Sequence, residues 1–278
     1  METAMKNKAL DDIRLKKCRT IPVPGFNRFP ELLGGFTTRY GGVSTGAYAS
    51  LNLNFNRSDA PEIVMENYRL LGEELGVALD SMVLSHQVHD NRVMPITREH
   101  AGMGLVRERS YTRVDGLCTQ EKGLMLVTHY ADCVPLYFYD PDKQVIALSH
   151  SGWKGTLLDI GGETLRVLEE TYACKPEHIH VAFGPHIRSC CFEVDEDVAR
   201  PFREKYPWAE DYSRRREDGK WLLDLEAIIT QALVARRVPR EQIYGNKACT
   251  RCHHDIFFSH RGSGGHTGTG AAYLMMRG

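Results

Sequence analysis

A hairpin-like stretch near the middle of the chain constrains the fold more than any other feature. The segments VPLYFYD (residues 134–140) and QVIALSH (residues 144–150) have the length and the β-branched and aromatic content of buried strands, and a short polar segment separates them. If the turn consists of Pro141 and Asp142, Cys133 lies directly opposite His150 on antiparallel strands. A turn of another length would shift this register. The hairpin therefore predicts that a thiol and an imidazole meet at its open end.

Three interpretations of this thiol and imidazole are open. Cys133 and His150 can be two ligands of one metal ion, because zinc binds Cys sulfur and His nitrogen. Cys133 can instead be a nucleophile that His150 activates, or an ordinary buried thiol beside an unrelated histidine. The segment SHSGWKG (residues 149–155) has the composition of a strand-to-helix turn. Exposed backbone N–H groups at such a turn favour an anion and lower the pKa of a nearby thiol.

Helix and strand patterns interleave along the rest of the chain. Apolar spacing and end signals predict helices over residues 58–76, 155–172, 194–206 and 224–237. Alternating or apolar runs predict strands over residues 81–96 (as a pair), 113–119, 123–132 and 178–184. The second helix is expected to bury Leu158, Leu165, Leu168 and Tyr172. Because regular βαβ alternation is absent from the pattern, the predicted fold class is α/β, a single-domain layered α/β sandwich with mixed, largely antiparallel sheets.

Composition and charge narrow the class of partner. The sequence has 35 Lys and Arg against 36 Asp and Glu, for a net charge of -1. This balance gives no basic excess for nucleic acid, and no apolar run is long enough to span a membrane. The first residues lack the apolar core of a signal peptide, so we expect a cytoplasmic protein. The eight cysteines are then expected to be free thiols, metal ligands or catalytic groups rather than disulfides.

Seven sequence blocks occur in an order that resembles a known family. They are GGFTTRYGGVSTGAYASLNLN, ENYRLL, SHQVH, THYADCVPLYFYDP, LSHSGWKGT, FGPHIRSCCFEV and CTRCHHDIFFSHR. Together they closely resemble the YfiH/YlmD-like family, whose members are also described as laccase-domain or polyphenol oxidase proteins. The resemblance implies one α/β catalytic domain. We therefore expect residues 31–278 to form that domain, and residues 1–30 to form an N-terminal extension with the first strand region.

The resemblance also implies a metal site made from two histidines and one cysteine. The family positions are the histidine of QVH, the cysteine of ADC and the histidine before SGW, which here are His89, Cys133 and His150. These residues are predicted to be both the catalytic residues and the metal ligands. The implied metal is zinc, with copper as the alternative. Three protein ligands and one open position are typical of catalytic zinc.

The chemistry implied by the resemblance is that of purine nucleosides. The family is associated with phosphorolysis of adenosine, inosine and methylthioadenosine to the free base and a (methylthio)ribose 1-phosphate, and with deamination of adenosine. A purine nucleoside and phosphate are the expected partners, without nucleic acid or membrane, and the oligomeric state is not predicted. Two alternatives are a metal-free hydrolase or deamidase that uses Cys133 and His150, and a copper-dependent phenol oxidase.

Substrate contacts are predicted from motif position and residue chemistry. Arg39 in TTRYGG and Arg69 in ENYRLL are candidate phosphate contacts, because a guanidinium can match phosphate with two hydrogen bonds. Asn52 in SLNLN is a candidate contact to the ribose or the base. The alternative roles are surface salt bridges for the two arginines and a turn cap for Asn52.

One departure from the family pattern bears on phosphate recognition. The family often has TGR near the C-terminus, whereas Thr267-Gly268 is followed here by Thr269. The cationic contact is then missing, or Arg188 or Arg261 replaces it. This departure puts phosphate recognition and substrate preference in question, rather than the metal site.

The remaining cysteine motifs are expected to bind no metal. CTRCHHD (residues 249–255) holds a CxxC and two histidines. A structural zinc site needs four ligands, and adjacent histidines do not easily both point inward with the two cysteines. Cys190 and Cys191 are adjacent, so their side chains diverge if the segment is extended, and packing is their expected role.

Overall fold

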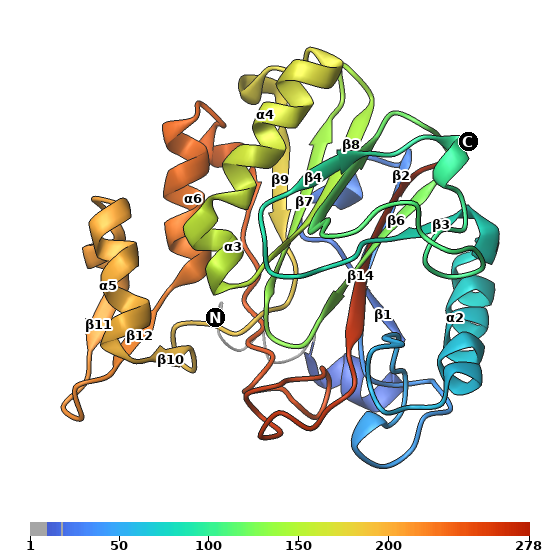
Figure 1. The fold of residues 1–278 in the computed structure, drawn as a ribbon, viewed down its shortest axis with the longest axis horizontal. Helices are drawn as coiled ribbons and strands as arrows, with labels where there is room; N and C mark the ends of the chain where they lie inside the picture. Colours follow the sequence, from blue (N-terminus) through green and yellow to red (C-terminus); the bar gives the residue numbers. More distant parts are fainter. Residues whose placement is uncertain (1–9, 18) are drawn as a thin grey trace.

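Two large mixed sheets, one small sheet and the helices that cover them make up the fold (Figure 1). The computed structural model describes residues 10–17 and 19–278. In the first large sheet the strand order is β1-β2-β14-β6-β3, with the bounds Thr20–Pro22, Leu32–Thr37, Gly270–Met276, Met125–Tyr130 and Met82–Leu84. Strands β3 and β6 pair in parallel, whereas β1 with β2 and β14 with both of its neighbours pair antiparallel.

The second large sheet has the strand order β13-β9-β7-β8-β5-β4. The bounds of these strands are Ile243–Tyr244, His180–Phe183, Val134–Asp140, Val145–Ser151, Gly116–Thr119 and Val93–Pro95. The pair of short strands predicted over residues 81–96 forms as β3 and β4, but these strands belong to different sheets. The connection between them therefore carries the SHQVH motif from one sheet to the other.

The predicted hairpin forms as β7 and β8, with a different register. Asp140 pairs with Val145, and Pro135 pairs with His150. Residues 141–144 connect the strands, so the predicted two-residue turn is wrong, and so is the prediction that Cys133 lies directly opposite His150. The register differs by two residues, which is the side-chain period of a strand, so both side chains stay on the same face as diagonal neighbours.

Three apolar cores lie between the layers of the fold. One lies between the two large sheets and includes Phe36 and Leu126 from the first sheet and Tyr137 and Leu148 from the second. Another lies between the second sheet and helices α3 (Trp153–Leu158), α4 (Ile160–Tyr172) and α6 (Leu225–Ala235), and a third between the first sheet and α2 (Pro61–Leu75). Figure 1 shows α2 on one side of the sheets and α3, α4 and α6 on the other. This order confirms the predicted layered α/β sandwich.

The helix predicted over residues 155–172 is broken into α3 and α4. Asp159 has a left-handed backbone with φ 67°, and its side chain accepts a hydrogen bond from the backbone N–H of Gly162 at the start of α4. The break turns Leu158 to the surface, where it is 46% exposed, so its predicted role in the core is wrong. Leu165 and Leu168 are buried as predicted.

A small lobe flanks the second sheet. It contains α5 (Glu196–Lys205) and a three-stranded sheet of order β10-β12-β11, with the bounds Glu193–Val194, Trp221–Leu223 and Ser213–Arg215. Figure 1 shows this lobe at the left edge of the molecule, beyond α6. Among the described residues, no helix combines the length and the apolar character needed to cross a membrane.

Candidate active site

The structure brings the three predicted metal ligands together. His89 lies in the connection between β3 and β4, Cys133 directly precedes β7, and His150 lies within β8. Their ligand atoms are all within 4.8 Å of one another, and the ring centroids of His89 and His150 are 4.9 Å apart. Because zinc bonds to these donors are about 2.0–2.3 Å long, small side-chain movements bring all three onto one ion. Two imidazoles and one thiolate thus fit a metal with an open coordination position.

Gly152 leaves the space in which these ligands converge. A Cβ atom at this residue would lie 2.9 Å from Cδ2 of His89 and 3.1 Å from Sγ of Cys133. His89 has a left-handed backbone with φ 63°, which is uncommon for a residue other than glycine. The surrounding contacts therefore hold His89 in a conformation that it would rarely adopt alone.

The buried carboxylate of Asp115, directly before β5, supports both histidines. Its Oδ1 lies 2.9 Å from Nδ1 of His150 and accepts a hydrogen bond of 3.0 Å from the backbone N–H of His89. The backbone N–H groups of Val88 and Asp90 donate to Oδ2 at 2.9 and 3.2 Å. Burial raises the pKa of Asp115, but the bonds from His150 and these amides lower it below its usual value. Because Nδ1 of His150 is engaged, Nε2 is the nitrogen available to a metal.

The charges within the cluster favour a thiolate. Burial raises the pKa of Cys133, but His150 and then His89 lower it, to about 6. Burial lowers the pKa of His150, whereas Cys133 and Asp115 raise it to about 9. A thiolate is the form of cysteine that binds metal and also the form that acts as a nucleophile.

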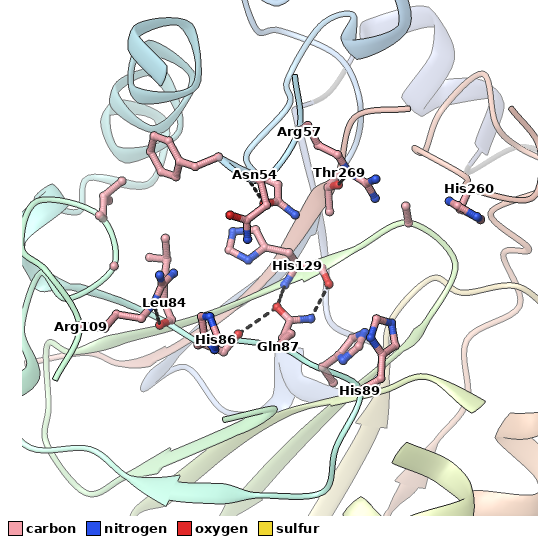
Figure 2. Close-up of a pocket in the computed structure, with 17 residues that line it drawn as sticks. Asn54, Arg57, Leu84, His86, Gln87, His89, Arg109, His129, His260 and Thr269 are labelled. Carbon is pink, nitrogen blue, oxygen red and sulfur yellow. Dashed lines mark hydrogen bonds between the residues drawn. The ribbon is translucent and has the colours of Figure 1, made fainter. Parts of the chain in front are cut away.

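A cavity of about 490 Å³ opens beside the cluster (Figure 2). His89 and His150 lie on its wall, and Figure 2 shows Arg109 on the opposite side from His89. The volume falls within the range of about 300–1,000 Å³ that is typical of small-molecule sites. Further polar residues on the wall are Asn54, Arg57, Ser85, His86, Gln87, His129, His260 and Thr269.

Two arginines supply positive charge to this wall. Nε of Arg57 donates to Oγ1 of Thr269 over 3.2 Å, and Nε of Arg109 donates to the backbone oxygen of Leu84 over 3.1 Å. Arg57 thus stands beside the residue at which the family pattern often has an arginine. A guanidinium carries five N–H donors in a planar fork, so further donors remain for an anion after these contacts.

Gln87 and His129 form a fixed, neutral part of the wall. The backbone N–H of His129 donates to Oε1 of Gln87 over 2.7 Å, and Nε2 of Gln87 donates to the backbone oxygen of His129 over 2.8 Å. The ring Nε2 of His129 lies 2.6 Å from the hydroxyl of Tyr68. Burial, followed by the charge of Arg109, lowers the pKa of His129 to about 3. This imidazole therefore contributes hydrogen bonding without a charge.

Comparison with known proteins assigns the chain to one family. Residues 34–277 match the profile described as multi-copper polyphenol oxidoreductase laccase. The chain belongs to this laccase-domain family. It is 36% identical over 251 residues to the purine nucleoside phosphorylase YlmD of Geobacillus stearothermophilus, covering 90% of this chain and 92% of the relative. It is 33% identical over 248 residues to the adenosine deaminase RL5 of an unknown prokaryotic organism, covering 87% and 94%.

The solved structures support the same laccase-domain family. The crystal structure of the hypothetical protein YfiH of Bacillus licheniformis is similar, with a TM-score of 0.87 and 31% sequence identity. The match covers 92% of this chain and 97% of that one. The resemblance to YfiH/YlmD-like proteins found in the sequence blocks is thereby confirmed.

Arg39 and Arg69 of this laccase-domain chain do not line the cavity. Nε of Arg39 donates to the backbone oxygen of Ala49 over 2.8 Å, and its guanidinium lies 5.0 Å from the ring centroid of Phe258. Arg69 lies on the exposed face of α2, where it pairs with Glu66 and Glu73. The contacts of Arg69 match the alternative role of a surface salt bridge.

Asn52 lies behind the cavity wall and is fully buried. Its Oδ1 accepts hydrogen bonds from the backbone N–H groups of Thr269 and Asn54, at 3.0 and 3.3 Å. Its Nδ2 donates to Asp59 over 3.0 Å. Asn52 therefore positions two residues of the wall, and a direct contact with substrate stays a prediction.

Among the charged residues of the cavity and the cluster, Arg57, Arg109 and Asp115 were not predicted from the sequence. Arg57 follows the SLNLN motif by only a few residues, so the motif marks its neighbourhood without marking the side chain. Asp115 lies within the strand predicted over residues 113–119, and Arg109 lies in the polar segment before that strand. Arg188 and Arg261, the predicted replacements for the missing arginine, do not line the cavity.

Proposed function

We propose that this chain is a zinc-dependent purine nucleoside enzyme. The reaction is phosphorolysis of adenosine, inosine or methylthioadenosine to the free base and the (methylthio)ribose 1-phosphate, together with deamination of adenosine. The observation that carries the proposal is one cavity of about 490 Å³ whose wall includes His89 and His150 of the three-ligand cluster together with two arginines. The names of the relatives, purine nucleoside phosphorylase and adenosine deaminase, support this choice of substrate.

His89, Cys133 and His150 would hold the zinc, and Asp115 would orient the two histidines. A zinc ion with three protein ligands supplies a Lewis acid and lowers the pKa of a coordinated water towards about 7. Asp115 keeps the negative charge that stabilises a cationic or metal-bound His150, because its pKa is below the usual value.

Arg57 and Arg109 are the proposed phosphate contacts. In phosphorolysis a phosphate oxygen bonds to C1′ of the ribose while the bond from C1′ to the purine nitrogen breaks, and the electron pair leaves with the base. Two guanidinium groups neutralise the phosphate dianion and hold it near the sugar. Arg39 and Arg69, which do not line the cavity, are not needed for this role.

The nucleoside itself is proposed to contact the neutral part of the wall. Phe55 lines the cavity and stacks on Tyr68, with ring centroids 5.9 Å apart and an interplanar angle of 6°. A purine can pack against such a ring. Asn54 and His129 offer hydrogen bonds to the base or the ribose without adding charge.

The direct test is to incubate zinc-loaded protein with inosine and with adenosine, each with and without phosphate, and to separate the products by chromatography. We expect hypoxanthine from inosine only when phosphate is present, and inosine from adenosine without phosphate. If zinc-loaded protein releases no base and converts no adenosine, the proposed function is wrong. Copper-loaded protein tested with a phenol covers the oxidase alternative in the same experiment.

The second candidate is a metal-free hydrolase or deamidase with Cys133 as the nucleophile. One observation favours it, because Cys133, His150 and Asp115 form a chain of the kind used in cysteine hydrolases. His89 has no role in such a chain, yet it lies within the same cluster. Stoichiometric zinc on the purified protein, with Cys133 protected from iodoacetamide until the zinc is removed, would count against this candidate.

A further inference from the structure

A second group of metal-ligating side chains lies away from the cavity. The sulfur atoms of four cysteines, here called the cysteine cluster, are all within 4.8 Å of one another; they are Cys190, Cys191, Cys249 and Cys252. Sγ of Cys252 lies 3.7 Å from that of Cys190 and 3.4 Å from that of Cys191. None of the cavity-lining residues belongs to this group. The proposed function therefore leaves the cysteine cluster without a role.

Two tight turns bring these four side chains together. The backbone N–H groups of Cys191 and Phe192 both donate to the backbone oxygen of Arg188 over 2.8 Å, so residues 188–192 form a turn. The divergence expected for Cys190 and Cys191 applied to an extended segment and does not hold in a turn. In the second segment the backbone N–H of His253 donates to the oxygen of Cys249 over 3.0 Å, which brings both cysteines of the CxxC to one side.

Backbone contacts hold the two turns side by side. His186 and Cys249 form a parallel bridge, and the backbone N–H of Thr250 donates to the oxygen of His186 over 3.0 Å. The backbone N–H groups of Arg188 and Cys252 donate hydrogen bonds to the sulfur of Cys249. Such amide bonds to sulfur commonly support thiolate ligands in metal sites. Both segments are therefore fixed before any ion binds.

The distances suit a metal better than a disulfide. A tetrahedral zinc ion with Zn–S bonds of about 2.3 Å places its sulfur atoms about 3.8 Å apart, close to the observed separations. A disulfide would need about 2.05 Å between two sulfur atoms. Four sulfur ligands in a tetrahedron are typical of zinc or iron, and four-coordinate sites without an open position are structural. We propose that the cysteine cluster binds one structural zinc ion.

The proposed zinc ties one end of the small lobe to the segment that leads to the wall of the active site. The turn at residues 188–192 leads into β10 of the lobe, and residues 249–252 lead towards the loop that carries His260 and Thr269. Asp132, the neighbour of Cys133, contacts Ile187 directly before the first turn and Thr250 within the second segment. Its carboxylate accepts hydrogen bonds from Thr250 at 2.6 Å and from the backbone N–H of Arg261 at 2.7 Å, and its backbone oxygen accepts one from Ile187 at 2.9 Å.

The test removes the first metal cluster so that any remaining zinc reports on the cysteine cluster. The parent is Cys133→Ala, and the test variant adds Cys190→Ser and Cys252→Ser, both at exposed positions. The matched control adds Cys174→Ser to the same parent, because Cys174 is a buried thiol outside both clusters. After growth with zinc, elemental analysis should find about one zinc ion per chain in the parent and the control, and almost none in the test variant.

A second measurement does not depend on a serine variant that folds. Cobalt is added to the metal-free Cys133→Ala protein, in which the cysteine cluster is the remaining group of sulfur ligands among the described residues. Intense thiolate-to-cobalt absorption with tetrahedral ligand-field bands supports the proposal. It is overturned if these bands do not appear, if iron replaces zinc in the elemental analysis, if the test variant keeps the zinc of its parent, or if mass spectrometry of the purified protein finds these cysteines joined as disulfides.

Discussion

The two groups of ligands in this molecule differ in donor number, donor type and surroundings. His89, Cys133 and His150 offer three donors, two of them on the wall of a cavity, and a buried carboxylate contacts both histidines. The cysteine cluster offers four sulfur donors between two turns, and none of the four cysteines lines the cavity. Three donors leave a position for a reactant, whereas four thiolates close the coordination shell. The two groups thus separate a proposed catalytic site from a proposed structural site by the number of their ligands.

The largest expected effect comes from removing one of the three candidate ligands beside the cavity. His150→Ala should lower the rate of phosphorolysis by about 10³-fold or more, because the loss of several kcal/mol of charge stabilisation corresponds to that factor. The measurement is kcat/KM for inosine with phosphate, with circular dichroism as the check of folding. His178→Ala is the control, since His178 pairs with Asp142 at the surface. A folded His150→Ala protein with wild-type activity would contradict the assignment.

The next effect concerns the orientation of the ligands. Asp115→Asn keeps the shape of the side chain but removes the charge that faces His150, so zinc affinity should fall by about 10–100-fold. Competition with a chromophoric chelator measures this affinity. Asp218→Asn is the matched control, because Asp218 lies in an exposed turn beside Arg216. Equal zinc affinity in both variants would show that Asp115 does not support the cluster.

The sequence predicted His150, the residue of the first prediction, but it did not predict Asp115, the residue of the second. The candidate ligands His89, Cys133 and His150 came from the family blocks, and the strands around them from apolar runs. Asp115 was missed because a single carboxylate before a strand has no spacing that marks it. The register of the hairpin was wrong because the pattern does not show that residues 141–144 all belong to the connection.

The cavity and the cysteine cluster were less predictable for a common reason. Their residues come from segments far apart in the chain, such as Arg57 with Thr269, or Cys191 with Cys252. Local periodicity carries no information about which loops meet. Leu158 was misplaced because Asp159 interrupts the helix with a left-handed residue, and the helical pattern continues across that break. The layered sandwich was predictable because it depends on the apolar faces of each element.

A third prediction compares the effect on KM for phosphate of arginines on the cavity wall with that of an arginine elsewhere. Arg57→Gln and Arg109→Gln should each raise KM for phosphate by about 10–100-fold, because a charged hydrogen bond contributes about 1.5–3 kcal/mol. Steady-state kinetics with varied phosphate measure this change. Arg69→Gln should leave KM for phosphate within about twofold, since exposed salt bridges contribute little. The reverse ranking would return the phosphate site to Arg69.

The smallest effect is steric. Gly152→Ala places a Cβ atom against His89 and Cys133, so the ligands must shift by a few tenths of an ångström and zinc affinity should fall by about tenfold. Gly161→Ala is the control, because a Cβ there meets its nearest atom at 3.5 Å, an ordinary contact. The same chelator competition applies to both. Unchanged affinity in a folded Gly152→Ala protein would mean that this glycine does not limit the ligand geometry.

One measurement tests the contrast between the two clusters most directly. Inosine phosphorolysis is compared between Cys133→Ser and the double variant Cys190→Ser with Cys252→Ser, each purified as a folded, zinc-loaded protein. We expect Cys133→Ser to be inactive, and the double variant to keep its activity within about tenfold while it melts at a lower temperature, because a structural zinc contributes to folding. Full activity of Cys133→Ser would contradict the division between a catalytic and a structural site. So would a double variant that is folded but inactive while Cys133→Ser stays active.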